Sequence, residues 1–415
     1  MVRSHWIAGE DELSALASEW TALMARAAAP QPVLTPTWLL AWWRAFGRLD
    51  GRRLAALTLR DATTDRLVGL VPMLERRARH ALAVPLRRLE LLASGEDEAD
   101  EICSDYLGAL FERDRVSELA RATTDALLER ATEWDELVMR GMEEGSPTVD
   151  ALEAAFRSAG MAVDRSVSGE CPFTTLPGSW EEWLESLDGQ RRYFVRRTLR
   201  DFEKWAGPGG GELHRASTPD ELIEGRAVLA RLHGERWSEG GVFRSEVFSR
   251  FHREVMDRFR AGDGAELDLL WLTVRGEPVA ALYNIVYGNK VYFYQSGRKI
   301  DVPKGVRPGI VIHLYAMQRA IAGGIREYDF LNGATPYKRQ LASGTRGLIT
   351  LRAVSPSLRG RGVEAARKLV VSAADEVKRH PWGQAALRAT AQVRARHSTM
   401  PPRSRSTPPG PREGS

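Results

Sequence analysis

The residues around position 305 are of the types that hold a phosphate group. Gly305, Arg307, Pro308 and Gly309 stand at the start of an apolar segment whose large aliphatic side chains recur at helical spacing. Because proline is favoured in the first turn of a helix, this pattern predicts a helix over 308–322. The first N–H groups of a helix are unpaired and attract anions, and glycine lets a phosphate approach the backbone closely. The sequence therefore predicts a phosphate-binding loop, with an ordinary strand–loop–helix connection as the alternative.

Groups able to move protons follow along the chain. Residues 325–331 have the pattern of a strand that contains Asp329, and Tyr337 comes shortly after it. A carboxylate at the end of a strand beside a cleft could accept a proton from an amine, and a tyrosine could return one to a leaving thiolate. An ion pair of Asp329 with Lys338 or Arg339, which would only hold the loop in place, is the alternative.

A stripe of basic residues follows one face of the helix predicted over 191–205. Its members recur every four residues and are Arg192, Arg196, Arg200 and Lys204. Such a stripe could receive an acidic acceptor, a nucleotide phosphate or RNA, although a solvated helix face is the simpler interpretation. The candidates for substrate binding are Arg196 from this stripe and Arg236 and Trp237 at the end of another predicted helix.

The composition argues against several classes of site. The chain has 415 residues and two cysteines, Cys103 and Cys171, without partners at metal-ligand spacing. Its eight histidines show no ligand spacing, and the Gly-x-Ser-x-Gly motif of many serine hydrolases does not occur. We therefore expect no metal and no disulfide framework. No apolar run reaches the ~18–20 residues of a membrane-spanning helix, and the first residues lack the apolar core of a signal peptide, so we expect a cytoplasmic protein.

The positive charge of the chain is concentrated near its C-terminus. The net charge is +4, but twelve lysines and arginines stand against four acidic residues beyond residue 355, so the preceding part is mildly acidic. We therefore do not expect the folded part to bind nucleic acid. The residues from Pro381 onward are rich in Arg, Ser, Thr, Pro and Gly and cannot bury a core, so we expect a basic tail that is disordered beyond about His397.

The order of predicted elements is similar in the two halves of the chain. Each half has helices, a strand–turn–strand pair, a helix and a further strand, and "EWDELVMRG" in the first half parallels "IREYDFLNG" in the second. Duplication is the interpretation, with coincidence as the alternative. The expected fold class is α/β (α+β), with mixed central sheets flanked by helices in two tandem domains. The expected boundaries are 1–175 for the first domain, 176–356 for the second, and 357–415 for a helix and the basic tail.

Four segments together resemble a known family. They are "RRTLRDFEKW", "LARLHGERW", "LDLLWLTVRGEPVAALYNIVYGNKVYFYQSGRK" and "RPGIVIHLYAMQRAIAGGIREYDFLNGATPYKRQL". They resemble the GNAT-like acyltransferases grouped around the CelD cellulose-biosynthesis proteins, which are related to the FemAB peptidyltransferases. The resemblance spans about residues 180–353. It extends more weakly into the first half through "WDELVMRG" and the segment Cys103-Ser104-Asp105-Tyr106.

This resemblance implies two GNAT-like domains and a reaction. An acyl group, acetyl in the simplest case, would pass from acyl-CoA by direct attack to an amine or hydroxyl of a small molecule or of a cell-envelope or polysaccharide precursor. The strand with Tyr292, Tyr294 and Ser296 would bind pantetheine and polarise the thioester through a backbone N–H.

The resemblance also assigns roles around this strand. The residues implied at the pyrophosphate are Gly305, Arg307, Pro308 and Gly309, and those implied at the acceptor are Asp329, Tyr337 and Lys338. The loop departs from the usual Arg/Gln-x-x-Gly-x-Gly/Ala signature, and the FemAB relatives use aminoacyl-tRNA. An aminoacyl-tRNA-dependent transferase and a non-catalytic binding protein therefore stay open as alternatives.

Overall fold

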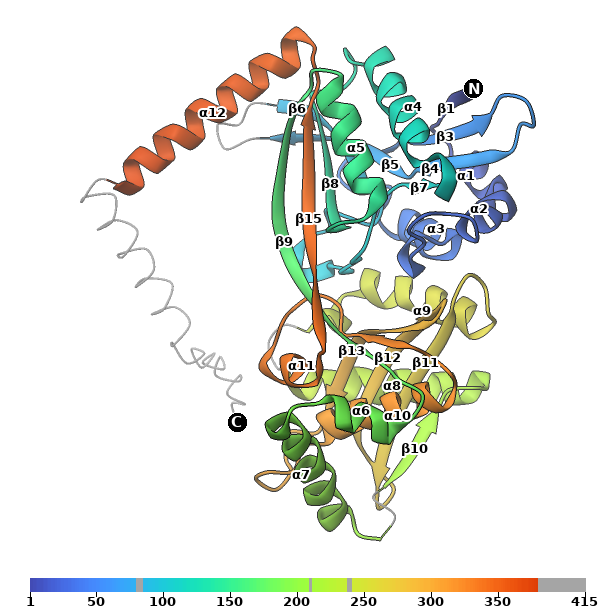
Figure 1. Cartoon of the computed structure of the whole chain (residues 1–415), viewed down its shortest axis with the longest axis vertical. Helices are drawn as coiled ribbons and strands as arrows, with labels where there is room; N and C mark the ends of the chain where they lie inside the picture. Colours follow the sequence, from blue (N-terminus) through green and yellow to red (C-terminus); the bar gives the residue numbers. More distant parts are fainter. Residues whose placement is uncertain (80–84, 209–210, 237–240, 380–415) are drawn as a thin grey trace, which may run out of the picture. The chain divides into compact units, whose positions relative to one another are not determined.

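Two sheets organise the described part of the computed structural model, which comprises residues 1–79, 85–208, 211–236 and 241–379. The larger sheet has the strand order β10-β11-β12-β13-β14-β9-β15-β8-β6-β5-β2, and the smaller has the order β1-β3-β4-β7 (Figure 1). We call residues 2–158 lobe 1 and residues 180–341 lobe 2.

The elements of each lobe follow the chain. Lobe 1 contains β1 (Val2–Ile7), α1 (Glu10–Ala15), α2 (Ala17–Met24), η1 (Pro32–Leu34), α3 (Pro36–Phe46), β2 (Arg53–Leu54), β3 (Ala56–Asp61), β4 (Leu67–Val71), β5 (Met73–Arg79), β6 (Pro85–Leu91), η2 (Glu98–Asp100), β7 (Leu110–Phe111), η3 (Arg113–Arg115), α4 (Val116–Glu129), β8 (Glu136–Glu143) and α5 (Pro147–Ser158). Lobe 2 contains α6 (Trp180–Ser186), α7 (Gly189–Ala206), β10 (Glu212–Arg215), α8 (Pro219–Arg236), η4 (Val242–Arg244), α9 (Glu246–Arg260), β11 (Glu266–Val274), β12 (Glu277–Tyr287), β13 (Lys290–Arg298), α10 (Pro308–Ala322), β14 (Glu327–Asp329) and α11 (Pro336–Leu341).

The alternation of apolar residues along β11 explains how lobe 2 packs. Leu270 and Leu272 point into the core shared with α7 and α10, whereas Leu269 and Trp271 point into the core shared with α8 and α9. Because successive side chains of a strand point to opposite faces, a strand covered on both faces is apolar throughout. The predicted helix over 308–322 is confirmed as α10, and the strands that the sequence predicts over 267–274, 279–287 and 290–296 are confirmed as β11, β12 and β13.

Two long strands join the lobes into one sheet. β9 (Ala162–Thr175) and β15 (Gly344–Val354) are antiparallel partners along their length, from Ala162 opposite Val354 to Phe173 opposite Gly344. β15 also pairs with β8 of lobe 1, and β9 pairs with β14 of lobe 2. The residues of β9 are mostly exposed and polar up to Glu170, so the strand lacks the alternating pattern that predicts one, and the sequence analysis missed it.

Three predicted elements are corrected at their bounds. The apolar stripe of Leu13, Leu16, Trp20 and Leu23 predicts one helix over 12–27, but the structure has two helices, α1 and α2, that meet at Leu16. The apolar run over 67–74 predicts one strand, but Pro72, which has no N–H to donate to a partner strand, divides it into β4 and β5. The strand expected over 325–331 ends at Asp329, because the chain turns at Leu331 with φ of 52°.

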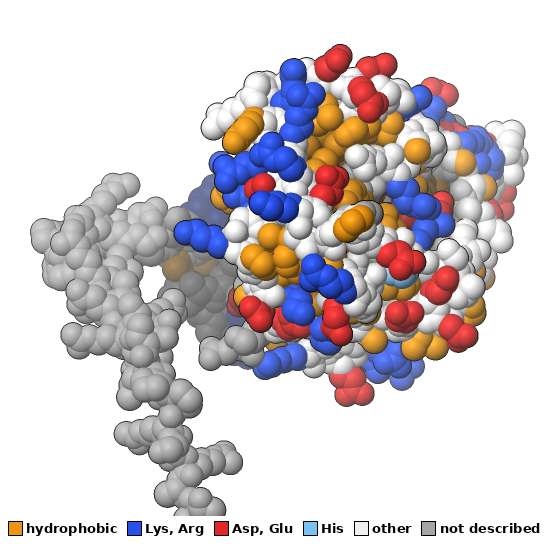
Figure 2. Space-filling view, turned by 90° about the horizontal axis from the view of Figure 1, so that it is seen from below, with side chains coloured by type: hydrophobic (Ala, Val, Ile, Leu, Met, Phe, Trp, Pro, Cys, Tyr) orange, Lys and Arg blue, Asp and Glu red, His pale blue; other side chains and the backbone are white. Residues whose placement is uncertain are grey.

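The predicted fold class is confirmed, while the exact domain boundaries stay a prediction. A helix after residue 356 is present as α12 (Leu358–Arg379), whose residues from Gly362 onward belong to a second unit of the chain. The predicted disordered tail lies outside the described residues. Within the described ranges, no helix has both the length and the apolar character needed to cross a membrane. On the face seen in Figure 2, basic and acidic side chains are interspersed.

Candidate active site

Strands β13 and β14 separate in the middle of lobe 2. Their parallel register runs only from Lys290 opposite Glu327 to Tyr292 opposite Asp329. β14 ends there, whereas β13 continues to Arg298. The carboxylate of Asp329 accepts the N–H of Leu331 at 2.8 Å, which holds the turn that takes the chain out of the sheet. The edge of β13 from Phe293 onward therefore faces a gap instead of a strand.

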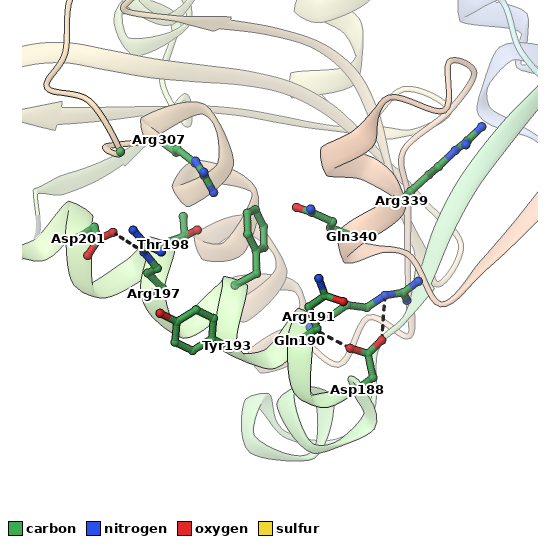
Figure 3. A pocket seen from close by; sticks show the side chains of 12 residues that line it. Asp188, Gln190, Arg191, Tyr193, Arg197, Thr198, Asp201, Arg307, Arg339 and Gln340 are labelled. Carbon is green, nitrogen blue, oxygen red and sulfur yellow. Dashed lines mark hydrogen bonds and ion pairs between the residues drawn. The ribbon is translucent and has the colours of Figure 1, made fainter.

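Three neighbouring cavities surround this gap. The splay cavity, of about 390 Å³, lies between Phe293–Ser296 of β13 and Phe330–Lys338, and Glu101, Cys103 and Asp105 of lobe 1 complete its wall. The loop cavity, of about 290 Å³, lies at the start of α10 and shares Ser296 and Tyr337 with the splay cavity. The α7 cavity, of about 570 Å³, shares Arg307 with the loop cavity (Figure 3).

The predicted phosphate loop opens onto two of these cavities. Arg307, Pro308 and Gly309 line the loop cavity, and Gly305 and Arg307 line the α7 cavity. Gly305 has φ of 96°, a left-handed conformation that suits glycine. A Cβ added at Gly309 would lie 2.9 Å from Cδ of Arg298, so the backbone is closely approached there. The entrance of α10 is thus at a cavity surface and is not plugged by core side chains.

The aromatic side chains of β13 mostly face lobe 1. The hydroxyl of Tyr292 is buried and donates to Oε1 of Gln31 at 2.9 Å. The hydroxyl of Tyr294 donates to the carbonyl of Ile102 and lies 2.9 Å from Nε2 of His252. Burial lowers the pKa of His252 to about 3, so its ring is neutral and its Nε2–H can donate to the tyrosine.

Two of the three β13 residues that were predicted to bind the donor lie at a cavity. Tyr294 and Ser296 line the splay cavity, and Ser296 also lines the loop cavity, whereas the side chain of Tyr292 lines neither. A role of Tyr292 in donor binding would therefore have to use its backbone.

Asp329 lies beneath the splay cavity and not in its wall. Its side chain is buried, with 1% of the residue exposed, and accepts a hydrogen bond from the hydroxyl of Tyr106 at 2.8 Å and an ion pair from Arg346 at 3.2 Å. Burial raises its pKa to about 6, although the N–H of Leu331, the hydroxyl of Tyr106 and the charge of Arg346 all oppose that rise. The ion pair that the structure gives for Asp329 is with Arg346, and the alternative of a pair with Lys338 or Arg339 stays a prediction.

Lys338 and Tyr337 begin the short helix α11 and line the splay cavity. Nζ of Lys338 is buried and donates to the carbonyls of Phe330 at 2.7 Å and Asn332 at 2.9 Å. The ammonium group therefore fastens the turn that follows β14. Tyr337 is half-buried and lines the splay and loop cavities, which places it between them.

Asp105 of lobe 1 also lines the splay cavity, and the sequence analysis did not select it as a site residue. Its Oδ2 accepts the N–H of Asn332 at 2.8 Å, and only 9% of the residue is exposed. Burial raises its pKa to about 7, against the hydrogen bond from Asn332. The nearby charges of Asp329 and Glu101 raise this pKa further, and that of Lys338 lowers it. A carboxyl with such a pKa can exchange a proton near neutral pH.

Comparison with known proteins identifies the fold. Residues 189–339 match the family model described as an acetyltransferase (GNAT) domain. Residues 189–339 therefore form a domain of the GNAT acetyltransferase type. A conserved protein of unknown function from Bacteroides thetaiotaomicron VPI-5482 superposes with a TM-score of 0.51 at 13% identity, over 85% of this chain and 100% of that one. FemX superposes with a TM-score of 0.51 at 12% identity, over 83% of this chain and 96% of that one. No curated protein matches the chain in sequence.

The matched GNAT range contains most of the site, but not all of it. It runs from the first residue of α7 to Arg339 in α11 and so includes β13, α10 and β14. Asp105 and Tyr106 lie outside it, in lobe 1. The segment Cys103-Ser104-Asp105-Tyr106, which carries part of the family resemblance, was the one signal that could have pointed to them.

Of the three predicted substrate-binding residues, only Arg196 has a described side chain. Arg196 is exposed on α7 and lines none of the three cavities, whereas its neighbour Arg197 lines the α7 cavity. Arg236 is the last residue of α8, and Trp237 lies outside the described residues. In the part of the chain that the structure describes, no group of three or more His, Cys, Asp and Glu side chains could hold a metal ion.

Proposed function

We propose that this GNAT protein transfers an acyl group, acetyl in the simplest case, from acyl-CoA to a primary amine or hydroxyl group. The acceptor would be a small molecule or a cell-envelope or polysaccharide precursor. The observation that carries the proposal is that the loop cavity and the splay cavity share Ser296 and Tyr337. The loop cavity lies at the start of a helix, and the splay cavity contains titratable groups. A donor in the first would present its thioester to an acceptor in the second.

The loop cavity suits the phosphate-bearing part of the donor. The N–H groups at the start of α10 and the side chain of Arg307 both attract anions, and Gly309 lets a phosphate approach the backbone. From Phe293 onward the edge of β13 has no register with β14, so its amide groups are available to pantetheine and to the thioester oxygen. The backbone N–H groups would stabilise the negative charge that develops on that oxygen.

Asp105 is our candidate for the general base. The carboxylate takes a proton from the attacking amine, the amine nitrogen bonds to the thioester carbon, and the C–S bond breaks. Tyr337, which lies between the two cavities, then supplies a proton to the leaving thiolate. Asp329 is our candidate for a positioning residue, because its hydrogen bond to Tyr106 holds the segment that carries Asp105. Lys338 has a similar positioning role through the carbonyls of Phe330 and Asn332.

An amine suits the splay cavity better than a neutral hydroxyl does. Glu101 and Asp105 both line it, and Lys338, the lysine in its wall, directs its ammonium group at backbone carbonyls. A cationic acceptor would be attracted by these carboxylates. It would release its ammonium proton to solvent before attack and give a second proton to Asp105 as the new C–N bond forms. An amine is therefore the acceptor class that we favour.

The first test is calorimetric titration of the full chain with CoA, acetyl-CoA and longer acyl-CoAs. We expect binding of acetyl-CoA, and thiol release from it in the presence of primary amines but not of the matching alcohols. Failure of every CoA species to bind at millimolar concentration would exclude the proposed donor. Salt-sensitive retention of tRNA by a variant lacking residues 380–415 would instead favour the aminoacyl-tRNA-dependent alternative.

A further inference from the structure

The splay cavity is lined by neutral polar side chains to which the proposed mechanism gives no contact with the acceptor. They come from the free edge of β13 and from the turn before α11, and they are Gln295, Ser296, Asn332 and Thr335. Oδ1 of Asn332 already accepts the N–H of Gly333 at 2.8 Å. That leaves three side chains whose polar groups can contact a ligand.

The two β13 residues of this set lie on opposite faces of the sheet. Gln295 is opposite Tyr283 of β12, and Ser296 is opposite Leu282. Because directly opposed residues of antiparallel strands share a face, Gln295 lies on the face that α8 and α9 cover and Ser296 on the face that α7 and α10 cover. The splay cavity, which both residues line, therefore passes from one face to the other. An acceptor in it can meet a donor on the α10 side while its other groups lie near Gln295.

None of these three side chains has a hydrogen-bond partner among the described residues. Oγ1 of Thr335 is buried and unpaired, and it does not cap α11 although Thr335 directly precedes that helix. The amide of Gln295 and the hydroxyl of Ser296 are on half-buried residues and make no hydrogen bond within the described ranges. A buried polar group without a partner costs free energy, which a ligand with donors and acceptors restores. The cavity therefore suits an acceptor that carries hydroxyl groups besides its amine.

The charged groups of the cavity exclude other classes of acceptor. Glu101 is exposed and has no ion pair with any described residue, so it can attract an ammonium group. Nζ of Lys338 is buried against two backbone carbonyls and is not available to the carboxylate or phosphate of an acidic acceptor. A diamine would satisfy Glu101, but it would place methylene groups against the unpaired groups of Gln295, Ser296 and Thr335. A polyhydroxylated monoamine satisfies more of the wall than either.

Apolar surface completes the cavity and favours a ring. Phe293 and Phe330 line it beside the polar groups. A sugar ring has C–H groups on its faces and hydroxyl groups around its edge, so it needs apolar and polar walls at once. The volume of about 390 Å³ lies within the ~300–1,000 Å³ of small-molecule pockets and accommodates one sugar unit.

We propose that the acceptor is an amino sugar, held with its amino group at Asp105 and its hydroxyl groups at Gln295, Ser296 and Thr335. This assignment rests on the proposed function. The amino nitrogen bonds to the acetyl carbon as the C–S bond breaks, and the thiolate takes a proton from Tyr337. The products are the N-acetylated sugar and CoA. An amine of the same ring size without hydroxyl groups leaves three polar groups of the wall unsatisfied and is rejected for that reason.

A panel of six-membered rings tests this assignment on the full chain. The acceptors are glucosamine, galactosamine, cyclohexylamine and trans-1,4-diaminocyclohexane, and the measurement is kcat/KM for thiol release from acetyl-CoA, expressed per unprotonated amine. The amino sugars are the weaker bases and weaker nucleophiles, so a preference for them has to come from the site. We expect at least one amino sugar to exceed both hydroxyl-free amines about 100-fold, because each of three lost hydrogen bonds costs about fivefold.

The other outcomes of the panel separate this assignment from the proposed function. Cyclohexylamine that reacts as fast as both sugars would overturn the amino sugar and leave the acyl transfer to amines in place. A preference for the diamine would also overturn it and would give Glu101 a second ammonium group to bind. Calorimetric binding of acetyl-CoA without thiol release to any of the four amines would overturn the proposed function, and the assignment with it.

A matched pair of threonine variants locates the contact. T335V removes the unpaired hydroxyl from the splay cavity, and T148V removes one that is also buried without a partner but lines the cavity of about 20 Å³ in lobe 1. T335V should lower kcat/KM about fivefold for the preferred amino sugar and leave that for cyclohexylamine unchanged. T148V should change neither. An equal effect of T335V on both acceptors would overturn the contact. Should T335V not fold, the panel alone decides.

Discussion

Each lobe contains a pair of parallel strands joined by a helical crossover. In lobe 1, β6 and β8 are joined through α4, and in lobe 2, β13 and β14 are joined through α10. Each pair is in register over only three residues. In the first pair these run from Arg88 opposite Glu136 to Glu90 opposite Val138, and in the second from Lys290 opposite Glu327 to Tyr292 opposite Asp329. The two crossovers nevertheless differ in what lies beside them.

The two crossovers differ most in the segment that leads from the first strand to the helix. In lobe 1 it runs through residues 92–115, and Ile102, Leu107 and Leu110 of this segment are buried in the main core. In lobe 2 it runs through residues 299–307, with Gly305 and Arg307 exposed at cavities. Arg113 and Asp114, directly before α4, are exposed as well, but they line none of the three cavities around the site, whereas Gly305 and Arg307 do.

The strand after the helix differs too. β8 continues to Glu143 and is paired with β15 over most of its length, so little space is left beside the end of this strand. The large cavity of lobe 1, about 800 Å³, lies elsewhere and is lined by Trp6, Trp43 and Arg130 among others. The cavity beside Leu107 and Met142 has a volume of about 20 Å³, which is room for about one water molecule. β14 ends after three residues, and the gap that it leaves is the splay cavity. The comparison teaches that the length of the second parallel strand decides whether a cavity forms beside the first.

The largest effect is expected from Asp105, which belongs to the filled connection of lobe 1 but lines the cavity of lobe 2. D105N should lower turnover about 100-fold or more, because an amide cannot accept the proton of the amine. For the wild type, kcat/KM should rise with pH through about 7, since the raised pKa keeps Asp105 protonated and inactive below that pH.

The measurement is thiol release from acetyl-CoA with an active amine, as a function of pH. E98Q is the control, because Glu98 is exposed in the same connection and lines none of the three cavities. If D105N kept both its rate and the rise near pH 7, lobe 1 would have no part in the chemistry.

A smaller effect is expected from Asp329, the contact between the two lobes beneath the site. D329N should reduce turnover about tenfold, because the amide weakens the hydrogen bond to Tyr106 and the pairing with Arg346. The affinity for CoA, measured by calorimetry, should change less than the turnover does. An unchanged rate at saturating substrates would remove Asp329 from the chemistry and from its positioning role.

The smallest effect is expected from a valine placed at the second residue of each of the two crossover helices. Gly309 is the second residue of α10, and Ser117 is the second residue of α4. G309V should weaken CoA binding about fivefold, because its branched side chain fills the approach to the backbone. S117V should have no effect on CoA binding by calorimetry. Equal affinities of the two variants would mean that the donor does not use the start of α10.

Periodicity predicted the local elements of lobe 2 well. The apolar spacing and Pro308 gave the bounds of α10, and the strand–turn–strand pattern around Gly276 and Gly288 gave β11, β12 and β13. Both signals are local, since a turn needs positive φ within a few residues and a helix needs its apolar stripe. β9 was missed because it pairs on both edges while most of its side chains up to Glu170 stay exposed.

Local pattern cannot reveal which distant residue enters a cavity. The sequence indicated Tyr337 and Lys338, which follow β14 closely, and the structure brings both to the splay cavity. It also indicated Asp329, but alternation along a strand does not say what covers each face. The cover here is Tyr106 of lobe 1, so the carboxylate lies below the cavity.

By itself, the sequence determined where the helix at Pro308 begins and that glycine and arginine precede it, because these features depend on neighbouring residues. Only the tertiary structure decided that Asp105 meets Asn332 and that Arg197, not Arg196, lines a cavity. The physical reason is that burial and charge proximity come from chain segments far apart in sequence. They come together only when β9 and β15 have joined the two lobes into one sheet.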